Sequence, residues 1–370
     1  MNKTGIKLVD KYIFSQLAGA TFVGIFLFIV IWISPEILFR IIKQAMNGEV
    51  STQAAIRLFF AAIPEILGKA IPVGLMLGSL FVFDSLSKNF EIIVLKSIGM
   101  NFIRTVLPVI VLGIMGSFVC FYTYENLIPS SIKYIKTVKN DEPSIQFVYL
   151  DKNNVEKPKQ VIIVANFDGK NINNVNIVQF DNNGNRDIPM LKSIINTKRI
   201  YYTDNNWVIR QGLDYNVSNT GVYDDVKKIN NTVILSGNNA ITAYKLMQYA
   251  TKADKELKIK ELNNYLSLLK KENLNEEHGY ILNKLYQRYA QAFSCIIFAV
   301  TGVILGWSKP RQNRFLGFTI GAAIIFAYYL VVPFLDLLAE KAVLCPMITA
   351  WLPNIFIVTG MYFYMKHQDL

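Results

Sequence analysis

The feature that most constrains this chain is the grouping of its apolar residues into blocks as long as a bilayer is thick. Hydrophobic residues make up 52% of the 370 residues, and they are gathered into blocks instead of being spread as in a soluble core. Because a transmembrane helix needs about 20 apolar residues, this pattern predicts an integral membrane protein. Six blocks are long enough to span: about 12–33, 52–83, 102–124, 289–307, 315–338 and 348–365.

Six spans place both termini on one side of the membrane, and the basic residues predict which side that is. Positive charges in short loops favour the cytoplasm, and most of them fall on the side of the termini. We therefore expect a multi-pass protein of a cytoplasmic membrane with both termini cytoplasmic. The basic N-terminus lacks a small-residue cleavage site, which predicts a retained first span. Three basic residues fall on the opposite, periplasmic side: Arg40, Lys43 and Arg57.

The polar part of the chain, about 129–239, predicts an all-β domain inserted between the third and fourth spans. It is rich in Asn, Asp and Lys and contains short runs of β-forming residues separated by turn clusters. The expected fold is therefore a six-helix membrane protein with a periplasmic β domain of sandwich or jelly-roll type, whose strand order the pattern leaves open. The expected divisions are 1–128 with three spans, 129–239 with the β domain, 240–288 as a helical connector and 289–370 with three spans.

Several function classes are excluded by what the sequence lacks. The net charge of +11 is explained by lipid head groups and topology, so we expect no nucleic-acid partner. The nearest resemblance to a P-loop, at Gly68 and Lys69, has Ala70 where Ser or Thr should stand. The two histidines, His278 and His367, belong to no metal or catalytic motif. We therefore expect no enzyme activity, metal or cofactor, and energy must come from a partner or a gradient.

An amphipathic stretch at 85–101, with a helix at about 87–99, lies between the second and third spans. One helical face carries apolar side chains and the rest of the surface is charged, so the helix can lie at the membrane surface and be gripped by a soluble protein. The alternative interpretation for Glu91 is an exposed carboxylate in water that contacts no partner. The apolar face is Phe90, Ile93, Val94 and Ile98; Lys88, Glu91 and Lys96 lie elsewhere, and Gly99 is the expected stop.

Two pairs of charged residues, one at the non-cytoplasmic boundary of the membrane and one inside the second span, each allow two interpretations. Arg40 and Lys43 share a helical face and either bind lipid phosphate or extend to outer-leaflet head groups without binding a ligand. Glu65 and Lys69 are four residues apart inside the second span and either form a structural ion pair or leave Lys69 facing a lipid cavity.

The layout of three spans, a β domain and three more spans resembles the LptF/LptG permease family of the lipopolysaccharide exporter. The local match is more specific than the layout and covers nearly all of the chain in order, although in the β domain only the architecture matches. The loop before the fifth span is more similar to the F subunit than to the G subunit. The matching stretches are LFRIIKQAMNGEVS, PEILGKAIPVGLMLGSLFVFDSLSKNFEIIVLKSIGM, SKPRQNRFLGF and AWLPN.

This resemblance implies specific partners and binding residues. The helix after the second span would dock in a groove of a cytoplasmic ATPase, LptB, with Glu91 in the acidic position that pairs with an arginine there. Arg40, with its neighbour Lys43, would contact the phosphorylated head of lipopolysaccharide. Further expected partners are a second permease subunit, LptG-like or another copy of this chain, and periplasmic β-jelly-roll proteins of the LptC/LptA type. The candidate binding residues are Arg40, Lys43 and Lys69 for lipid and Lys88, Phe90, Glu91, Val94 and Gly99 for the ATPase.

Two functions from different classes are consistent with these features. The first is a permease subunit of an ABC-type exporter that extracts lipopolysaccharide from the inner membrane. The second is a membrane scaffold that transports nothing, or a mechanotransmitting permease that couples a cytoplasmic ATPase to a periplasmic partner. A scaffold needs neither paired basic residues at Arg40 and Lys43 nor a charged, proline-containing second span.

Overall fold

The structure is a computed structural model that describes residues 3–33, 39–48, 50–139, 145–152, 158–181, 190–218, 223–307 and 315–368. The chain divides into two compact units, which are described separately. The helical unit contains Met1–Lys139 and Asp254–Leu370, and the β unit contains Asn140–Ala253.

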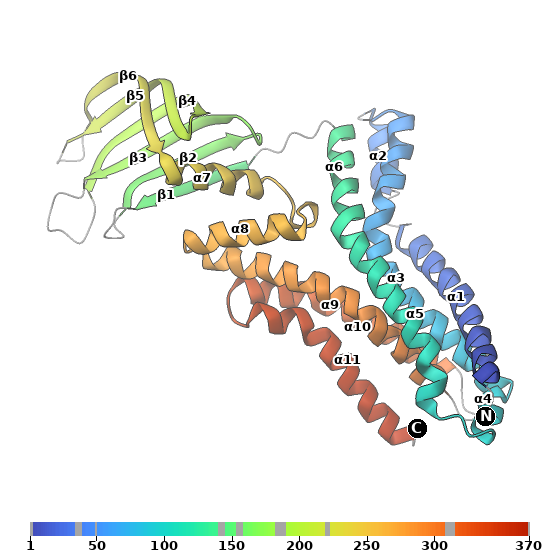
Figure 1. Ribbon diagram of the computed structural model, residues 1–370. Helices are drawn as coiled ribbons and strands as arrows, with labels where there is room; N and C mark the ends of the chain where they lie inside the picture. Colours follow the sequence, from blue (N-terminus) through green and yellow to red (C-terminus); the bar gives the residue numbers. More distant parts are fainter. Residues whose placement is uncertain are drawn as a thin grey trace. The chain divides into compact units, whose positions relative to one another are not determined.

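The helical unit confirms the six expected spans. Among the described residues, six helical segments are long and apolar enough to cross a membrane. The chain ends marked in Figure 1 both lie at the end of this unit where α4 lies, as six crossings require. The helices are α1 Lys3–Ile33, α2 Phe39–Met46, α3 Thr52–Lys88, α4 Glu91–Ser97, α5 Phe102–Tyr122, α6 Ile128–Lys139, α8 Ile259–Lys271, α9 Asn275–Gly306, α10 Phe315–Glu340 and α11 Pro346–Gln368, with a π-helical turn η2 Thr123–Leu127 and a 3-10 turn η3 Asp254–Glu256.

Two helices continue beyond the ends that the sequence predicted. The β domain was expected to begin near residue 129, but η2 and α6 extend the helix of α5 through Lys139 (Figure 1). The apolar residues Ile135 and Val138 of α6 pack against Ile41 of α2 and Leu58 of α3, so tertiary contacts support this polar helix. The fourth span was expected from residue 289, but α9 already begins at Asn275.

The centre of the helical unit is the pair α3 and α9, whose backbones touch at glycines. A Cβ atom added at Gly302 would lie 2.2 Å from the carbonyl oxygen of Met76, and one added at Gly306 would lie 2.6 Å from that of Leu80. Glycine is therefore required for this approach. The apolar spanning windows of α3 and α9 are 78% and 67% buried, whereas that of α10 is 17% buried. The outer helices thus leave most of their surface to lipid or partners.

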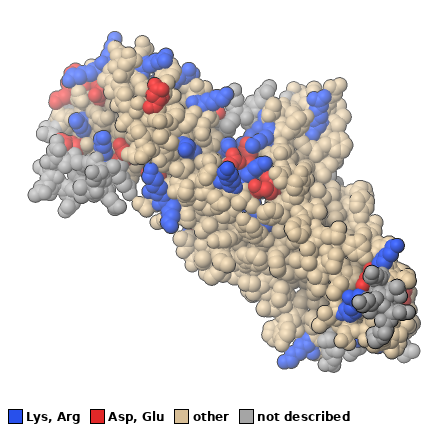
Figure 2. All heavy atoms as spheres, viewed as in Figure 1, with Lys and Arg blue, Asp and Glu red and all other residues tan. Residues whose placement is uncertain are grey.

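Charged side chains gather at the two ends of the helical unit, with a wide uncharged band between them on the face that Figure 2 shows. Near α4, Arg104 pairs with Asp10 at 2.6 Å. Glu125 of η2 lies roughly 20 residues after Arg104 along one continuous helix, which corresponds to about 30 Å and matches the hydrocarbon thickness of a bilayer. Lys69, Glu125 and Arg288 therefore lie near the second membrane boundary, which we call the outer end; the end with α4 is the inner end.

The β unit confirms the inserted antiparallel β domain. Its six strands form one sheet in which every neighbour is also the next strand in the chain, so the order β1 to β6 is consecutive. Helix α7 (Gly237–Ala250) covers the buried face, and its Ala240 carbonyl accepts a hydrogen bond from Trp207 Nε1 at 3.1 Å. The strands are β1 Ile145–Lys152, β2 Pro158–Phe167, β3 Ile172–Asp181, β4 Met190–Thr203, β5 Asn206–Val217 and β6 Tyr223–Ser236.

Candidate functional site

A cavity of about 250 Å³ with several charged residues in its lining lies at the outer end of the helical unit. It is lined by residues of α3, η2, α6, η3, α9 and α10, so segments from both halves of the membrane domain form its walls. This volume is far above the roughly 10–15 Å³ that one water molecule needs. Its charged lining residues are Lys69, Asp254, Lys255, Lys284, Arg288 and Asp336.

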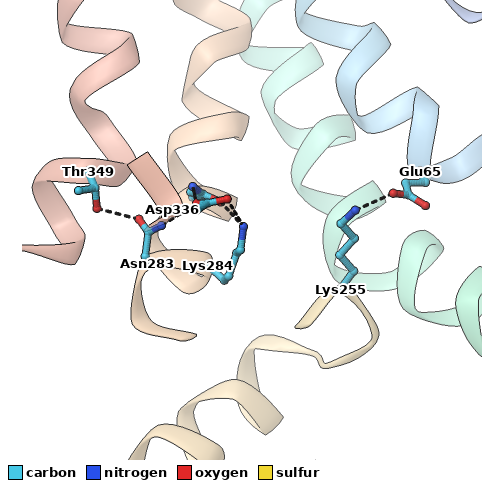
Figure 3. Close-up of polar contacts among 7 residues, drawn as sticks. Glu65, Lys255, Asn283, Lys284, Asp336 and Thr349 are labelled. Carbon is cyan, nitrogen blue, oxygen red and sulfur yellow. Dashed lines mark hydrogen bonds and ion pairs between the residues drawn. The ribbon is translucent and has the colours of Figure 1, made fainter. Parts of the chain in front are cut away.

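Asp336 of α10 is the centre of a polar network on one side of this cavity (Figure 3). Its carboxylate accepts hydrogen bonds from Asn283 Nδ2 at 2.8 Å and from Gln287 Nε2 at 2.5 Å, and it pairs with Lys284 Nζ at 2.5 Å. The side chains of Lys284 and Asp336 are only 17% and 16% exposed. Thr349 of α11 donates to Asn283 Oδ1 at 3.0 Å, so the network joins α9, α10 and α11.

The ion pair that the sequence suggested between Glu65 and Lys69 is replaced by another pair. Glu65 binds Lys255 of η3 at 2.7 Å (Figure 3). Burial disfavours the charged form of Lys255, but the hydrogen bond and charge of Glu65 outweigh burial and raise the pKa of this lysine. Lys69 lines the cavity, with Nζ 5.2 Å from the centre of the Trp32 ring, and its carbonyl accepts a hydrogen bond from Tyr329 at 2.9 Å.

The segment Asp254–Ile259, which we call the connector, begins where the helical unit resumes after the β unit. Arg288 Nη2 donates to the carbonyls of Asp254 and Leu257 at 2.9 and 2.6 Å. The backbone N–H of Ile259 donates to both oxygens of Glu125 at 3.2 and 3.1 Å. The π-helical turn thus places a carboxylate at the start of α8, and π-helical turns are frequent at functional sites. The connector is held by several elements at once.

The basic residues after the first span lie on α2 and near the start of α3. The side chain of Arg40 lies outside the described ones, so the structure does not place it. Lys43 is exposed, and Ile41 on the opposite side is buried against α3 and α6. Arg57, near the start of α3, is also exposed. The basic loop SKPRQNR lies outside the described residues.

Helix α4, at the inner end, presents the apolar face that the sequence predicted. Phe90, Ile93, Val94 and Ile98 are 56%, 48%, 58% and 65% exposed, while Ile92 is buried in the core of the helical unit. The helix therefore has one anchored side and one open apolar side. Exposed apolar groups clustered on one surface mark sites of partner or membrane contact.

The structure also gives the surroundings of the charged residues at α4 and of the glycine that ends this helix. Glu91 accepts a hydrogen bond from Tyr12 at 3.2 Å, which fixes its carboxylate near α1. Lys88 is exposed at the end of α3. Gly99 has a φ of +83° and ends the helix, as expected from the sequence, with its N–H bonded to the carbonyl of Lys96 at 3.0 Å.

Six charged residues in or beside the outer-end cavity were not among the site residues predicted from the sequence: Glu125, Asp254, Lys255, Lys284, Arg288 and Asp336. Asp336 carried a usable signal, because an ionisable residue inside an apolar block usually has a partner or a function. Lys255 and Lys284 stand among many other charges in the stretch 252–288 and carried no such signal. Within the described residues, no group of three or more His, Cys, Asp or Glu side chains is placed to hold a metal ion.

Comparison with known proteins identifies one family. Residues 11–366 match the family described as "Lipopolysaccharide export system permease LptF/LptG". A search of the curated proteins found no match.

Proposed function

Because this chain belongs to the LptF/LptG family of lipopolysaccharide export system permeases, we propose that it withdraws lipopolysaccharide from the outer leaflet of the inner membrane. Permeases of this family are transmembrane subunits, and the ATPase is a separate partner, LptB. The chain described here would accordingly supply the lipid pathway and the contact with the ATPase.

The observation that carries this proposal is the outer-end cavity, whose lining has more basic than acidic residues, within a family match that spans nearly the whole chain. Lys69, Lys255 and Lys284 line it near the level of lipid head groups. Lysine is a common ligand for phosphate, and the apolar surfaces of the surrounding spans suit acyl chains. A phosphorylated lipid therefore matches both the charge and the position of the cavity.

In the proposed pathway, Arg40 and Lys43 meet the lipid first and Lys69 binds it deeper in the cavity. The exposure of Lys43 and the position of Lys69 in the cavity wall support these roles. The chemistry needed is charge-assisted pairing of a cation with phosphate oxygens.

At the inner end, we propose that α4 docks in the cytoplasmic ATPase LptB. Phe90 and Val94 would fill an apolar groove, which fits the way an amphipathic helix lays its apolar face into a partner. Glu91 would supply a charged contact beside them, with Lys88 at the edge. Gly99, which ends the helix, would fix the direction of the chain into α5.

The remaining partners follow from the same assignment. A second permease subunit, G-like or another copy of this chain, would face the exposed surfaces of α1 and α10. We favour the F-like identity for this chain because of the loop SKPRQNR. Both termini would be cytoplasmic, and the periplasmic β unit would pass lipid to LptC/LptA-type proteins of the same sheet architecture.

Photo-crosslinking in living cells tests lipid extraction. A photoreactive residue at Lys43 or Lys69 should give a lipopolysaccharide adduct that depends on an active ATPase, whereas the same residue at Lys260, exposed on α8, should give much less. Only phospholipid or protein adducts in an intact complex would contradict the proposal and favour the scaffold function.

A further inference from the structure

The connector is attached to the helical unit at more points than a simple linker needs. Lys255 binds Glu65 of α3, Glu256 binds Lys136 of α6 at 2.6 Å, and Ile259 binds Glu125 of η2. Together with the bonds from Arg288, these contacts tie the connector to α3, η2, α6 and α9. Because Ala253, the last residue of the β unit, directly precedes it, any movement of the connector acts on the chain where it leaves the β unit.

The attachments differ in strength because they differ in burial. Glu256 is 8% exposed and Arg288 is 7% exposed, so their contacts are shielded from water. The side chains of Lys255 and Glu65 are 48% and 43% exposed. Exposed ion pairs contribute little because water and salt screen them. The bond between Lys255 and Glu65 is therefore the attachment that a competitor breaks most easily.

Lys255 also lines the cavity, so a ligand in the cavity reaches the same cation that Glu65 holds. Across the cavity, Lys284 is fully engaged with Asp336 in the buried network and forms a fixed wall (Figure 3). A phosphate monoester carries about −1.5 to −2 charges at neutral pH and offers three acceptor oxygens. It is therefore a stronger partner for Lys255 than one half-exposed carboxylate.

We propose that Lys255 exchanges partners: a phosphate group that enters the cavity displaces Glu65, and the connector is released from α3. This inference rests on the proposed function, since it takes the phosphate to be carried by the lipid cargo. Binding of cargo at the outer end would in this way loosen the segment that directly follows the β unit. Glu65 is then a competitor of the ligand and not part of its binding site.

The competition predicts opposite effects for the two partners of the pair. Full-length protein in detergent is titrated with fluorescent lipid A that carries both phosphate groups. Lys255→Gln should weaken binding and Glu65→Gln should tighten it, each about two- to fivefold, the scale of an exposed ion pair. Lys260→Gln, which removes an exposed charge in the first turn of α8, should leave the affinity unchanged. Dephosphorylated lipid A should show no response to Glu65→Gln.

Hydrogen exchange of the connector amides gives a second readout. Lipid A should speed exchange in residues 254–259 of the wild type, and in Lys255→Gln exchange should be fast before lipid is added. If both substitutions weaken binding, or neither alters it while lipid A still binds, the exchange of partners is contradicted and the proposed function stands. If the wild type binds no lipid A, the proposed function fails and this inference fails with it. Inorganic phosphate, titrated alone with the same variants, shows whether the site prefers soluble phosphate over the lipid head group.

Discussion

The two ends of the helical unit are held together in different ways. At the inner end, α3 and α9 approach until glycine backbones touch, and the open surface of α4 is apolar. At the outer end, the same two helices contribute charged residues to the lining of a cavity, and ion pairs join the surrounding segments. Close apolar packing resists deformation because interiors are dense, whereas an ion pair can exchange one partner for another.

This difference indicates that the two ends of the helical unit have different functions. A rigid inner end suits transmission of force from a docked partner, since a displacement of α4 is passed to the tightly packed helices α3 and α9. An outer end built from charges around a cavity suits binding and release of an anionic ligand. Four substitutions test the comparison, and they follow in order of the size of their expected effects.

The largest effect should come from Asp336→Ala. It leaves Lys284 buried without its carboxylate, and removing one partner of a buried pair typically costs about 3–5 kcal/mol. Thermal unfolding in detergent should show a strongly lowered midpoint. The double substitution Lys284→Met with Asp336→Met should recover much of the loss. Equal destabilisation by the double variant would show that packing of the surrounding apolar side chains, and not the ion pair, stabilises the outer end.

A substitution at the helix contact of α3 and α9 tests the rigid inner end. Gly302→Ala places a Cβ atom against the carbonyl of Met76, and overpacking of this kind costs about 1–3 kcal/mol. Gly19→Ala is the matched control because nothing lies within 4 Å of its added Cβ, and it should be neutral or slightly stabilising. The free energy of unfolding of both variants measures the difference. Tolerance of Gly302→Ala would mean that the inner end is not tightly packed.

The apolar face of α4 should be needed for partner binding and not for folding. Val94 is 58% exposed, so Val94→Asp should leave the unfolding midpoint nearly unchanged. It should lower the amount of ATPase that copurifies by about tenfold, as expected for a residue near the centre of an interface. Val94→Leu, which keeps an apolar side chain, should bind normally. Full ATPase recovery with Val94→Asp would remove α4 from the docking surface.

The smallest effect should come from Lys255→Gln, which removes a half-exposed ion pair and should cost below about 1 kcal/mol. The raised pKa of Lys255 fixes the sign of the pH dependence. The contribution is present below the ordinary lysine pKa and is lost as the pH rises through the folded-state pKa. Unfolding midpoints of wild type and variant should therefore converge at strongly alkaline pH. A constant difference across that range would mean that the charge of Lys255 does not stabilise the fold.

Local patterns were sufficient to predict the spans, the β-rich insertion and the apolar face of α4, because each depends on the spacing of neighbouring residues along the chain. The 20-residue apolar blocks follow from the thickness of the bilayer, and the face of Phe90 and Val94 follows from the period of the α-helix. The stop at Gly99 follows from the freedom of glycine at positive φ.

The outer-end contacts could not be predicted because their partners are far apart in sequence. The local rule paired Glu65 with Lys69 four residues later, but its partner Lys255 lies 190 residues further along the chain. Likewise, the polar composition after residue 128 suggested the β domain, whereas contacts of Ile135 and Val138 with α2 and α3 stabilise a helix there. Tertiary packing overrides local propensity at both places.

The most direct test of the account measures whether the ATPase docked at α4 changes lipid binding at the outer-end cavity. Protein with a photoreactive residue at Lys69 is reconstituted with LptB, the second permease subunit and lipopolysaccharide in vesicles, and adducts are compared with and without ATP. The account predicts that ATP lowers the lipopolysaccharide adduct in the wild type and leaves it unchanged in Val94→Asp. An adduct that ATP does not alter in the wild type, or that falls equally in both proteins, would contradict the account.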